Sequence, residues 1–380
     1  MSWRIAVVTA VAIAATAVAV RAESQRTIAG SLQLDYLMVP TDAHARDSAL
    51  DGMTAELSLK LNVDFTPSAA ASVKVCFACH GFEAASAFVD LRASDELSVR
   101  IGRMLPEFGS FPQRVDPANH RSNDKPLPYD MGRMLHHTEW NEGILPAPWV
   151  DNGVELLGTR FIGGGRFDYA AYILSGPKGG ADATDFDFVE SREPRQYYVD
   201  NNSEPVVGAR LSGTVELDAV GHAVTVGASV MTGRYDPQRH LGFVIAGADA
   251  TVNLEPLVIR AEYLVRRTDM AVGTDPAMRW KFGPDAAGRY DDHFLKHGFY
   301  AEVEVPFAQF DVFARFDGLV RTGNVLMGSP LSRSAYLLRY TGGAAIRISD
   351  SVRLKASAEV YQSNDLGNDL ALHLGVATPF

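Results

Sequence analysis

The chain has 380 residues, a formal net charge of -11 and two cysteines. An acidic chain without a basic cluster interleaved with aromatic residues is a poor nucleic-acid binder, so we expect no nucleic-acid partner. After residue 20 no apolar run reaches the length of about 18 residues that indicates a membrane-spanning helix, which leaves a soluble fold or a β-barrel.

The first 22 residues predict a cleaved export signal. Arg4 forms a short positive region, residues 5–20 are rich in alanine and valine, and Val20-Arg21-Ala22 offers a small-residue cleavage site. The apolar run is about 16 residues long, whereas a spanning helix needs about 20. We therefore expect an exported mature chain over residues 23–380. No Pro/Ser-rich linker divides it, so a single domain is predicted.

Alternation of apolar and polar residues with period two runs from residue 28 to the last residue and predicts β-strands. In residues 55–65 the odd positions are apolar and the even positions are polar or charged, and 259–266 and 352–360 repeat this pattern almost without exception. Charges at every second position of long strands fit a membrane barrel with a wet lumen. A soluble sandwich would instead have an apolar inner face.

Sixteen such segments occur, and an even number is what a closed bacterial barrel requires. They lie near 28–38, 53–66, 72–78, 85–93, 97–105, 153–163, 166–176, 205–218, 223–234, 239–254, 257–268, 292–307, 310–322, 333–348, 352–363 and 369–380. The long connections between them are 39–52, 106–152, 177–204 and 269–291. We predict an all-β fold, a single transmembrane antiparallel β-barrel of about 16 strands. Residues 106–152 are predicted to form a long, inward-folding constriction loop.

The last predicted strand has an apolar face that ends on an aromatic residue. This face consists of Leu370, Leu372, Leu374, Val376, Thr378 and Phe380. The chain here resembles Gram-negative outer-membrane porins, whose last strand ends in Phe and is recognised by the barrel-insertion machinery. Residues 97–109 are similar to the strand that leads into the constriction loop of porin O/P-like proteins. The resemblance implies a sixteen-stranded pore in the cell outer membrane, in contact with its lipid, with a homotrimer as one candidate assembly. It does not establish phosphate selectivity.

Cys76, Phe77, Ala78, Cys79 and His80 spell C-x-x-C-H and contain both cysteines of the chain. This motif attaches a c-type haem, because each thiol adds to one vinyl group while the imidazole takes the iron axially. A disulfide or a redox pair is the alternative, and a zinc site lacks the second cysteine pair it would need. We predict one haem c, with Cys76 and Cys79 as thioether anchors and His80 as the axial iron ligand.

The strand pattern places this motif at the end of the third strand. Val73 and Phe77 are predicted to face lipid, which turns Cys76 inward. In a continuing strand Cys79 would point to the opposite face. The chain is therefore expected to leave β geometry near Ala78 if both thiols are to reach one porphyrin.

The sixth position of the iron calls for a His or a Met that folding brings close, or for water. The candidates within the constriction loop are His120, Met131, Met134, His136 and His137. Met104 and His44 are weaker candidates. For each of them, packing of the loop against the wall is the alternative role.

Five arginines gather around the same loop: Arg100, Arg103, Arg114, Arg121 and Arg133. Guanidinium groups that face the lumen would bind haem propionates or attract anions. Charge balance is the interpretation we favour, and the loop carboxylates expected to provide it are Asp116, Asp124, Asp130 and Glu139. Arg100, Arg114 and Arg133 are predicted to line the pore.

A barrel that carries C-x-x-C-H resembles fused cytochrome-porins. The resemblance implies electron transfer across the outer membrane through a covalent haem, with periplasmic cytochromes or other electron carriers as partners. In those proteins the motif usually precedes the barrel, whereas here two strands come first. The competing hypotheses are a passive diffusion porin without haem, with or without a preference for anions, and a haem sensor or peroxidase-like barrel. No motif for other catalysis is present, so we do not expect an enzyme.

Overall fold

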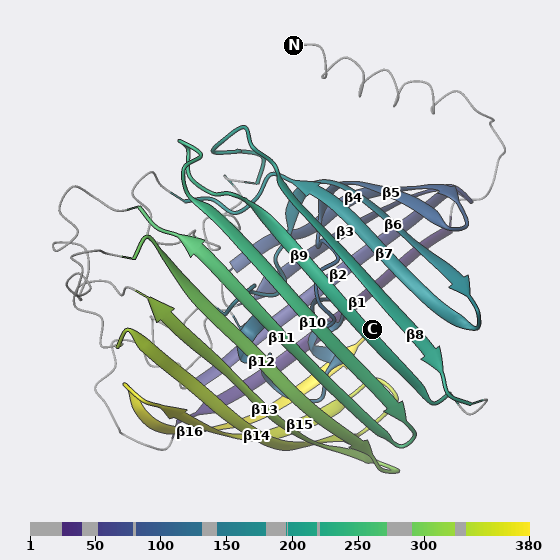
Figure 1. Cartoon of the computed structure of the whole chain (residues 1–380). Helices are drawn as coiled ribbons and strands as arrows, with labels where there is room; N and C mark the ends of the chain where they lie inside the picture. The colour runs from purple at the N-terminus through teal and green to yellow at the C-terminus, as the bar shows by residue number, and fades with distance from the viewer. Residues whose placement is uncertain are drawn as a thin grey trace, which may run out of the picture.

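The computed structural model describes residues 25–39, 52–78, 81–130, 143–179, 195, 197–218, 221–271, 291–323 and 332–380. Within these residues sixteen antiparallel strands form one closed barrel, in which every strand pairs with its neighbours in the chain and the first pairs with the last (Figure 1). The predicted fold class is therefore confirmed. The predicted export signal lies outside the described residues. No helix in the described part of the chain is long and apolar enough to cross a membrane.

The barrel strands agree closely with the predicted segments. They are β1 Gln25–Met38, β2 Gly52–Thr66, β3 Ala69–Ala78, β4 Gly81–Ser94, β5 Leu97–Met104, β6 Asp151–Ile162, β7 Gly165–Leu174, β8 Val206–Glu216, β9 Ala223–Arg234, β10 Gly242–Leu254, β11 Leu257–Asp269, β12 His293–Pro306, β13 Phe310–Gly323, β14 Ser334–Arg347, β15 Arg353–Ser363 and β16 Gly367–Pro379. Between β5 and β6 lie three short 3₁₀ turns: η1 Phe111–Arg114, η2 Pro117–Asn119 and η3 Leu127–Tyr129.

The largest difference from prediction concerns β4, which begins at Gly81 rather than near residue 85. Gly81 pairs with Ala78 across the β3–β4 ladder and has a φ of +93°, a value that glycine adopts readily. The strand β3 is therefore extended through Ala78. Cys79 and His80 lie between the paired residues and outside the described part of the chain.

Side chains alternate between an apolar outer face and a charged inner face, as the sequence predicts. On β13, Asp311 and Asp317 are buried inside, whereas Phe316 is exposed on the outside. On β11, Glu262 is buried while its neighbour Tyr263 is exposed. Carboxylates and guanidinium groups tolerate a hydrated, loop-filled lumen but not hydrocarbon, so this alternation determines which face turns inward.

The two ends of the barrel differ in the length of their connections. One end carries tight turns such as 67–68, 95–96 and 255–256, and the other carries the long connections 39–51, 105–150, 175–205 and 270–292. Successive connections alternate between the ends. Strand β3 therefore ends, and β4 begins, at the end of the barrel that carries the long connections.

The hydrophobic core lies between the inner wall and the connection 105–150. The described part of this connection runs inside the barrel (Figure 1). Phe108, Phe111, Leu127 and Ile144 of this connection are almost completely buried. They share one cluster with aromatic and aliphatic side chains of the wall, including Tyr300. Each such burial contributes roughly 1.5–3 kcal/mol, so the loop is held inside the lumen by packing as well as by polar contacts.

Candidate functional site

The predicted constriction loop, expected over 106–152, corresponds to the connection 105–150, which is described at 105–130 and 143–150. It is attached to the inner wall through two groups of charged side chains, one centred on Glu262 of β11 and the other on Arg339 of β14. These two anchors determine which part of the lumen the loop fills and which part it leaves open.

The Glu262 anchor holds the loop at two points, Ser110 and Tyr129. Its carboxylate accepts hydrogen bonds from the Ser110 amide at 3.0 Å, the Tyr129 hydroxyl at 2.5 Å and the Tyr300 hydroxyl at 3.2 Å. Burial, followed by the nearby Glu262 carboxylate, raises the pKa of Tyr129. The phenol therefore stays protonated and donates. The Phe111 ring stacks on Tyr129, with 5.3 Å between the ring centroids.

The Arg339 anchor holds the loop at Asp124, between the two points held by Glu262. One guanidinium nitrogen, Nη2, lies 2.6 Å from Asp317 Oδ2 of the wall, and Nη1 lies 2.9 Å from Asp124 Oδ2 of the loop. Nη1 is also 3.4 Å from Glu359 Oε2 on β15. All four side chains are almost completely buried. A planar guanidinium with several donors suits such a junction of three carboxylates better than a lysine does.

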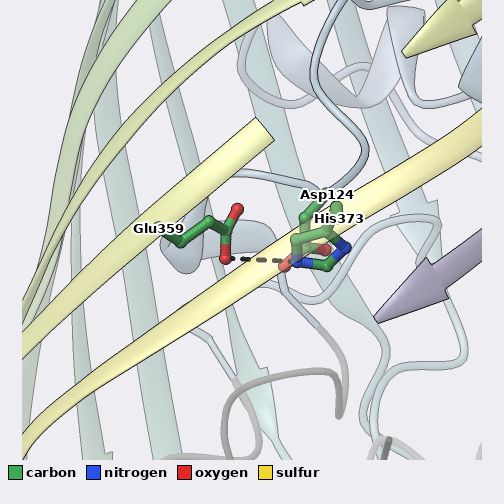
Figure 2. A group of neighbouring side chains, drawn as sticks. All are labelled: Asp124, Glu359 and His373. Atoms are coloured by element: carbon green, nitrogen blue, oxygen red, sulfur yellow. Dashed lines mark ion pairs between the residues drawn. The ribbon is translucent and has the colours of Figure 1, made fainter. Parts of the chain in front are cut away.

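Figure 2 shows Asp124, Glu359 and His373, whose ligand atoms lie within 4.8 Å of one another, close enough to suggest a metal site. The His373 imidazole is already engaged on both sides, with Nδ1 2.9 Å from Asp35 Oδ2 and Nε2 3.6 Å from Glu359 Oε2. The Arg339 guanidinium lies against both carboxylates of the group. A cation is thus already in place, and we interpret the group as an ion-pair cluster that fixes the loop.

Two further cations of the wall bind backbone oxygens of the loop. Lys355 Nζ donates to the carbonyls of Pro117 and Ser122, and Arg315 Nη1 donates to the Asp124 carbonyl at 3.1 Å. The carbonyl groups at the turns of the loop are not paired with N–H donors of a helix or a sheet. Charged donors from β13 and β15 take that role.

His120 is the one sixth-ligand candidate from the loop whose position the structure describes. Its Nδ1 lies 3.4 Å from Ser122 Oγ, and its Nε2 has no hydrogen-bond partner among the described residues. Burial, and then the charges of Lys355 and Arg114, lower the pKa of His120 well below its usual value. The imidazole is therefore neutral. The other predicted residues that lie outside the described part of the chain are His44, Cys79, His80, Met131, Arg133, Met134, His136, His137 and Glu139.

Cys76 faces the lumen on β3, and its side chain is 7% exposed. Its neighbours across the two ladders are Ser58 of β2 and Glu83 of β4, while Phe77, the next residue, is exposed on the outer wall. The register of β3 against β4 shifts just before Cys76, where Ala85 is the extra residue. Bulges of this kind redirect the side chains next to them. Met104 is fully buried at the end of β5.

The arginines near the loop pair mainly with carboxylates of the wall, not with the loop carboxylates that the sequence suggested. Arg100 Nε lies 2.9 Å from Asp90 and Nη1 lies 3.3 Å from Glu155. Arg114 Nη2 lies 3.2 Å from Glu302 of β12. Arg121 pairs in the same way with Asp311 of β13, at 2.7 Å. Of these, Arg100 lines a cavity of the lumen.

Arg103 belongs to the outer face of β5, which it shares with the exposed Ile101. Its guanidinium is covered by the ring of Tyr197, with 3.9 Å to the ring centroid, and its Nε donates to the Ala84 carbonyl. The Tyr197 hydroxyl in turn accepts from the Ala84 amide. The connection between β7 and β8 thus shields this cation from the surroundings of the barrel.

The part of the lumen that the loop leaves open lies along β2 to β8. A cavity of about 620 Å³ is lined by charged and polar residues of β2 to β5, among them Lys60, Asp90, Arg92 and Arg100. A second cavity of about 430 Å³ lies between the loop and β6 to β8, and Leu157 lines both cavities. The two anchors were not predicted from the sequence. Charged residues occupy many inward positions of these strands, so periodicity cannot rank one buried charge above another.

Several solved outer-membrane proteins have the same fold. The anion-selective porin from Comamonas acidovorans superposes with a TM-score of 0.57 at 11% identity, over 94% of this chain and 100% of that one. The outer membrane channel DcaP of Acinetobacter baumannii gives 0.57 at 10%, over 96% and 99%. OmpF of Salmonella typhi gives 0.57 at 10%, over 93% and 97%. At these identities the likeness is one of fold. No family model and no curated protein matches the sequence.

Proposed function

We propose that the chain is an outer-membrane channel through which small polar solutes diffuse. The observation that carries this proposal is the division of the lumen: the loop is anchored on β11 and β14, and cavities of about 620 and 430 Å³ remain along β2 to β8. A closed barrel with an apolar outer face fits a bilayer, and a polar, narrowed lumen fits a diffusion path. The porins that share the fold support the same function.

Solutes passing along β2 to β8 would meet charges that are largely paired. Arg100 is held by Asp90 and Glu155, and Arg210 by Asp249 at 2.6 Å, so neither presents an isolated charge. The size of the cavities, set by the anchored loop, limits which solutes pass. A proposed signal peptide over residues 1–22 and the terminal strand would serve export and insertion into the outer membrane.

Liposome swelling tests this function. The full chain is refolded into liposomes, and its folded state is checked by heat-dependent migration on a gel. We expect fast swelling in small sugars that declines as the sugar becomes larger. Gln113→Trp, which places a bulky ring at the wall of the second cavity, should slow the swelling. Liposomes with folded barrel that swell no faster than empty ones would contradict the proposal.

A second candidate function is electron transfer through one covalent haem c, and the observation that favours it is the lumen-facing Cys76 of C-x-x-C-H. Cys76 and Cys79 would hold the porphyrin and His80 would take the iron axially. His120 offers a neutral imidazole with an unpartnered, buried nitrogen inside the same barrel, which suits an iron ligand. A bound haem would supply one-electron redox chemistry, with periplasmic carriers as partners.

A haem stain and an absorption spectrum of the outer-membrane fraction test this second function. We expect a covalent stain in the unaltered chain and its loss in Cys79→Ser, with the barrel still folded. His120→Ala should shift the spectrum if His120 is the sixth ligand, and carbon monoxide should bind if that position is open. A folded barrel without covalent haem would leave only the diffusion channel.

A further inference from the structure

Two lysines stand directly opposite each other on the lumen side of the wall. Lys60 of β2 and Lys74 of β3 are partners in the ladder, and both occupy inward positions of their strands. Like charges at directly opposed positions destabilise a sheet pair. An anion between or beside the two ammonium groups removes that penalty.

One of the two lysines already has such an anion. Lys74 Nζ forms an ion pair with Asp116 of the constriction loop, and the two side chains are 17% and 33% exposed. Lys60 has no ion-pair or hydrogen-bond partner within the described part of the chain, and it lines the cavity of about 620 Å³. Asp116 thus shows that the space beside the two lysines accepts a carboxylate. Its single negative charge balances Lys74 and leaves the charge of Lys60 unbalanced.

The neighbouring pair in the same ladder adds uncharged polar groups. Asn62 and Ser72 are partners on β2 and β3, two residues from the lysines, and both line the same cavity. The Ser72 side chain is 5% exposed, and its hydroxyl has no hydrogen-bond partner among the described residues. A buried hydroxyl without a partner costs free energy until a ligand or water satisfies it.

We propose that Lys60, Lys74, Asn62 and Ser72 form a binding site in the lumen for small anionic solutes that carry a carboxylate or phosphate group. The site rests on the proposed channel function and gives it a solute class. Asp116 is a built-in competitor, because its tethered carboxylate occupies Lys74. An entering anion displaces Asp116 and thereby breaks the contact that the loop makes with β3.

The same carboxylate chemistry has a second source. A haem attached at Cys76, two residues beyond Lys74 on the same face of β3, carries two propionates that the lysines would bind. A free solute and a haem propionate make the same contacts. The protein with Cys79→Ser, which lacks one thioether anchor, separates these two occupants.

Binding of inorganic phosphate to the full chain, extracted from the outer membrane in detergent, tests the site, with ³¹P line broadening as the measurement. Lys60→Gln should weaken binding at least about tenfold, whereas Lys60→Arg keeps the charge and most of the affinity. Asp116→Asn should tighten binding by roughly tenfold, since a tethered carboxylate with a millimolar effective concentration no longer competes. Arg166→Gln is the matched control, because Arg166 lines the other cavity.

Equal phosphate binding in the unaltered chain, Lys60→Gln and Asp116→Asn would overturn the site. Conductance of the same samples in planar bilayers keeps this result separate from the channel function. Lys60-dependent binding without conductance supports the site and removes the channel, while conductance with Lys60-independent binding removes the site alone. If phosphate binds only in Cys79→Ser, the site exists and a haem propionate occupies it in the unaltered chain. If phosphate binds equally in Cys79→Ser and in the unaltered chain, the site is open to a free solute.

Discussion

The two halves of the lumen contrast sharply. Along β9 to β16 the wall is covered by the constriction loop, and its buried charges meet partners from that loop, as Glu262 meets Ser110 and Arg339 meets Asp124. Along β2 to β8 cavities remain, and Lys60 has no partner among the described residues. Both halves are built from the same alternating strands. The loop therefore decides which wall charges become structural and which stay available to solutes.

Because of this difference, substitutions of charged residues should lower the free energy of unfolding more in the covered half than in the open half. A charge that is buried against several partners leaves them unpaired when it is removed, whereas an exposed pair exchanges its partner for water. The predictions below compare the two halves in order of expected effect.

Arg339→Met should have the largest effect. It leaves Asp124, Asp317 and Glu359 without their shared guanidinium in an almost fully buried cluster. The expected loss is about 3–5 kcal/mol in the free energy of unfolding, measured by urea titration of the refolded barrel. Unchanged stability would show that the loop is held by its apolar core and not by this anchor.

Glu262→Gln should have the next largest effect. The amide keeps the shape of the side chain but loses the charge that accepts hydrogen bonds from Ser110, Tyr129 and Tyr300. We expect a loss of about 1.5–3 kcal/mol in unfolding free energy, together with a higher single-channel conductance as the loop loosens. Tyr300→Phe removes only one of these hydrogen bonds and serves as the graded comparison. If the conductance of Glu262→Gln equals that of the unaltered chain, this anchor does not determine the size of the pore.

His120 should make stability depend on pH. Because its pKa in the folded state is lowered, by burial first and by Lys355 and Arg114 next, the folded protein binds fewer protons than the unfolded chain. The contribution of His120 to the free energy of unfolding is complete above about pH 6.5, the usual pKa of His. It declines as the pH falls toward the lowered pKa, by at most about 1.4 kcal/mol per pH unit. In His120→Gln the unfolding free energy should decline less steeply between pH 7 and pH 5. Identical slopes in the two proteins would contradict this assignment.

Arg166→Ala should have the smallest effect. Arg166 lies in the open half and pairs with Asp168 at 2.9 Å, but its side chain is more than half exposed. Such a pair contributes about 0–1 kcal/mol, which the same urea titration should confirm. A loss comparable to that of Arg339→Met would erase the distinction between the two halves.

Local regularities predicted most of the fold. Alternation identified the sixteen strands, and every strand end except the start of β4 lies within three residues of its predicted place. The start of β4 was missed because the chain was expected to leave β geometry near Ala78, whereas Gly81 pairs with Ala78 and continues the ladder. A positive φ at glycine permits either outcome, and only the pairing decides between them.

The candidate site was predicted less completely. The inward orientation of Cys76 follows from its place between the outward-facing Val73 and Phe77 and could be predicted. The partners of Arg100, Arg114 and Arg121 could not, because ion pairs between strands depend on register and on the path of the loop. The sequence suggested carboxylates of the loop, whereas the wall supplies them.

By itself the sequence determined a barrel with an apolar outside, a charged inside and Cys76 of the C-x-x-C-H motif at an inward position, because a side-chain period of two is a local property of the chain. The tertiary structure decided the rest. It set Lys60 opposite Lys74, attached the loop to Glu262 and Arg339, and left the side of β2 to β8 open. These contacts join residues far apart in the chain, and only the closure of the barrel and the packing of its loop bring them together.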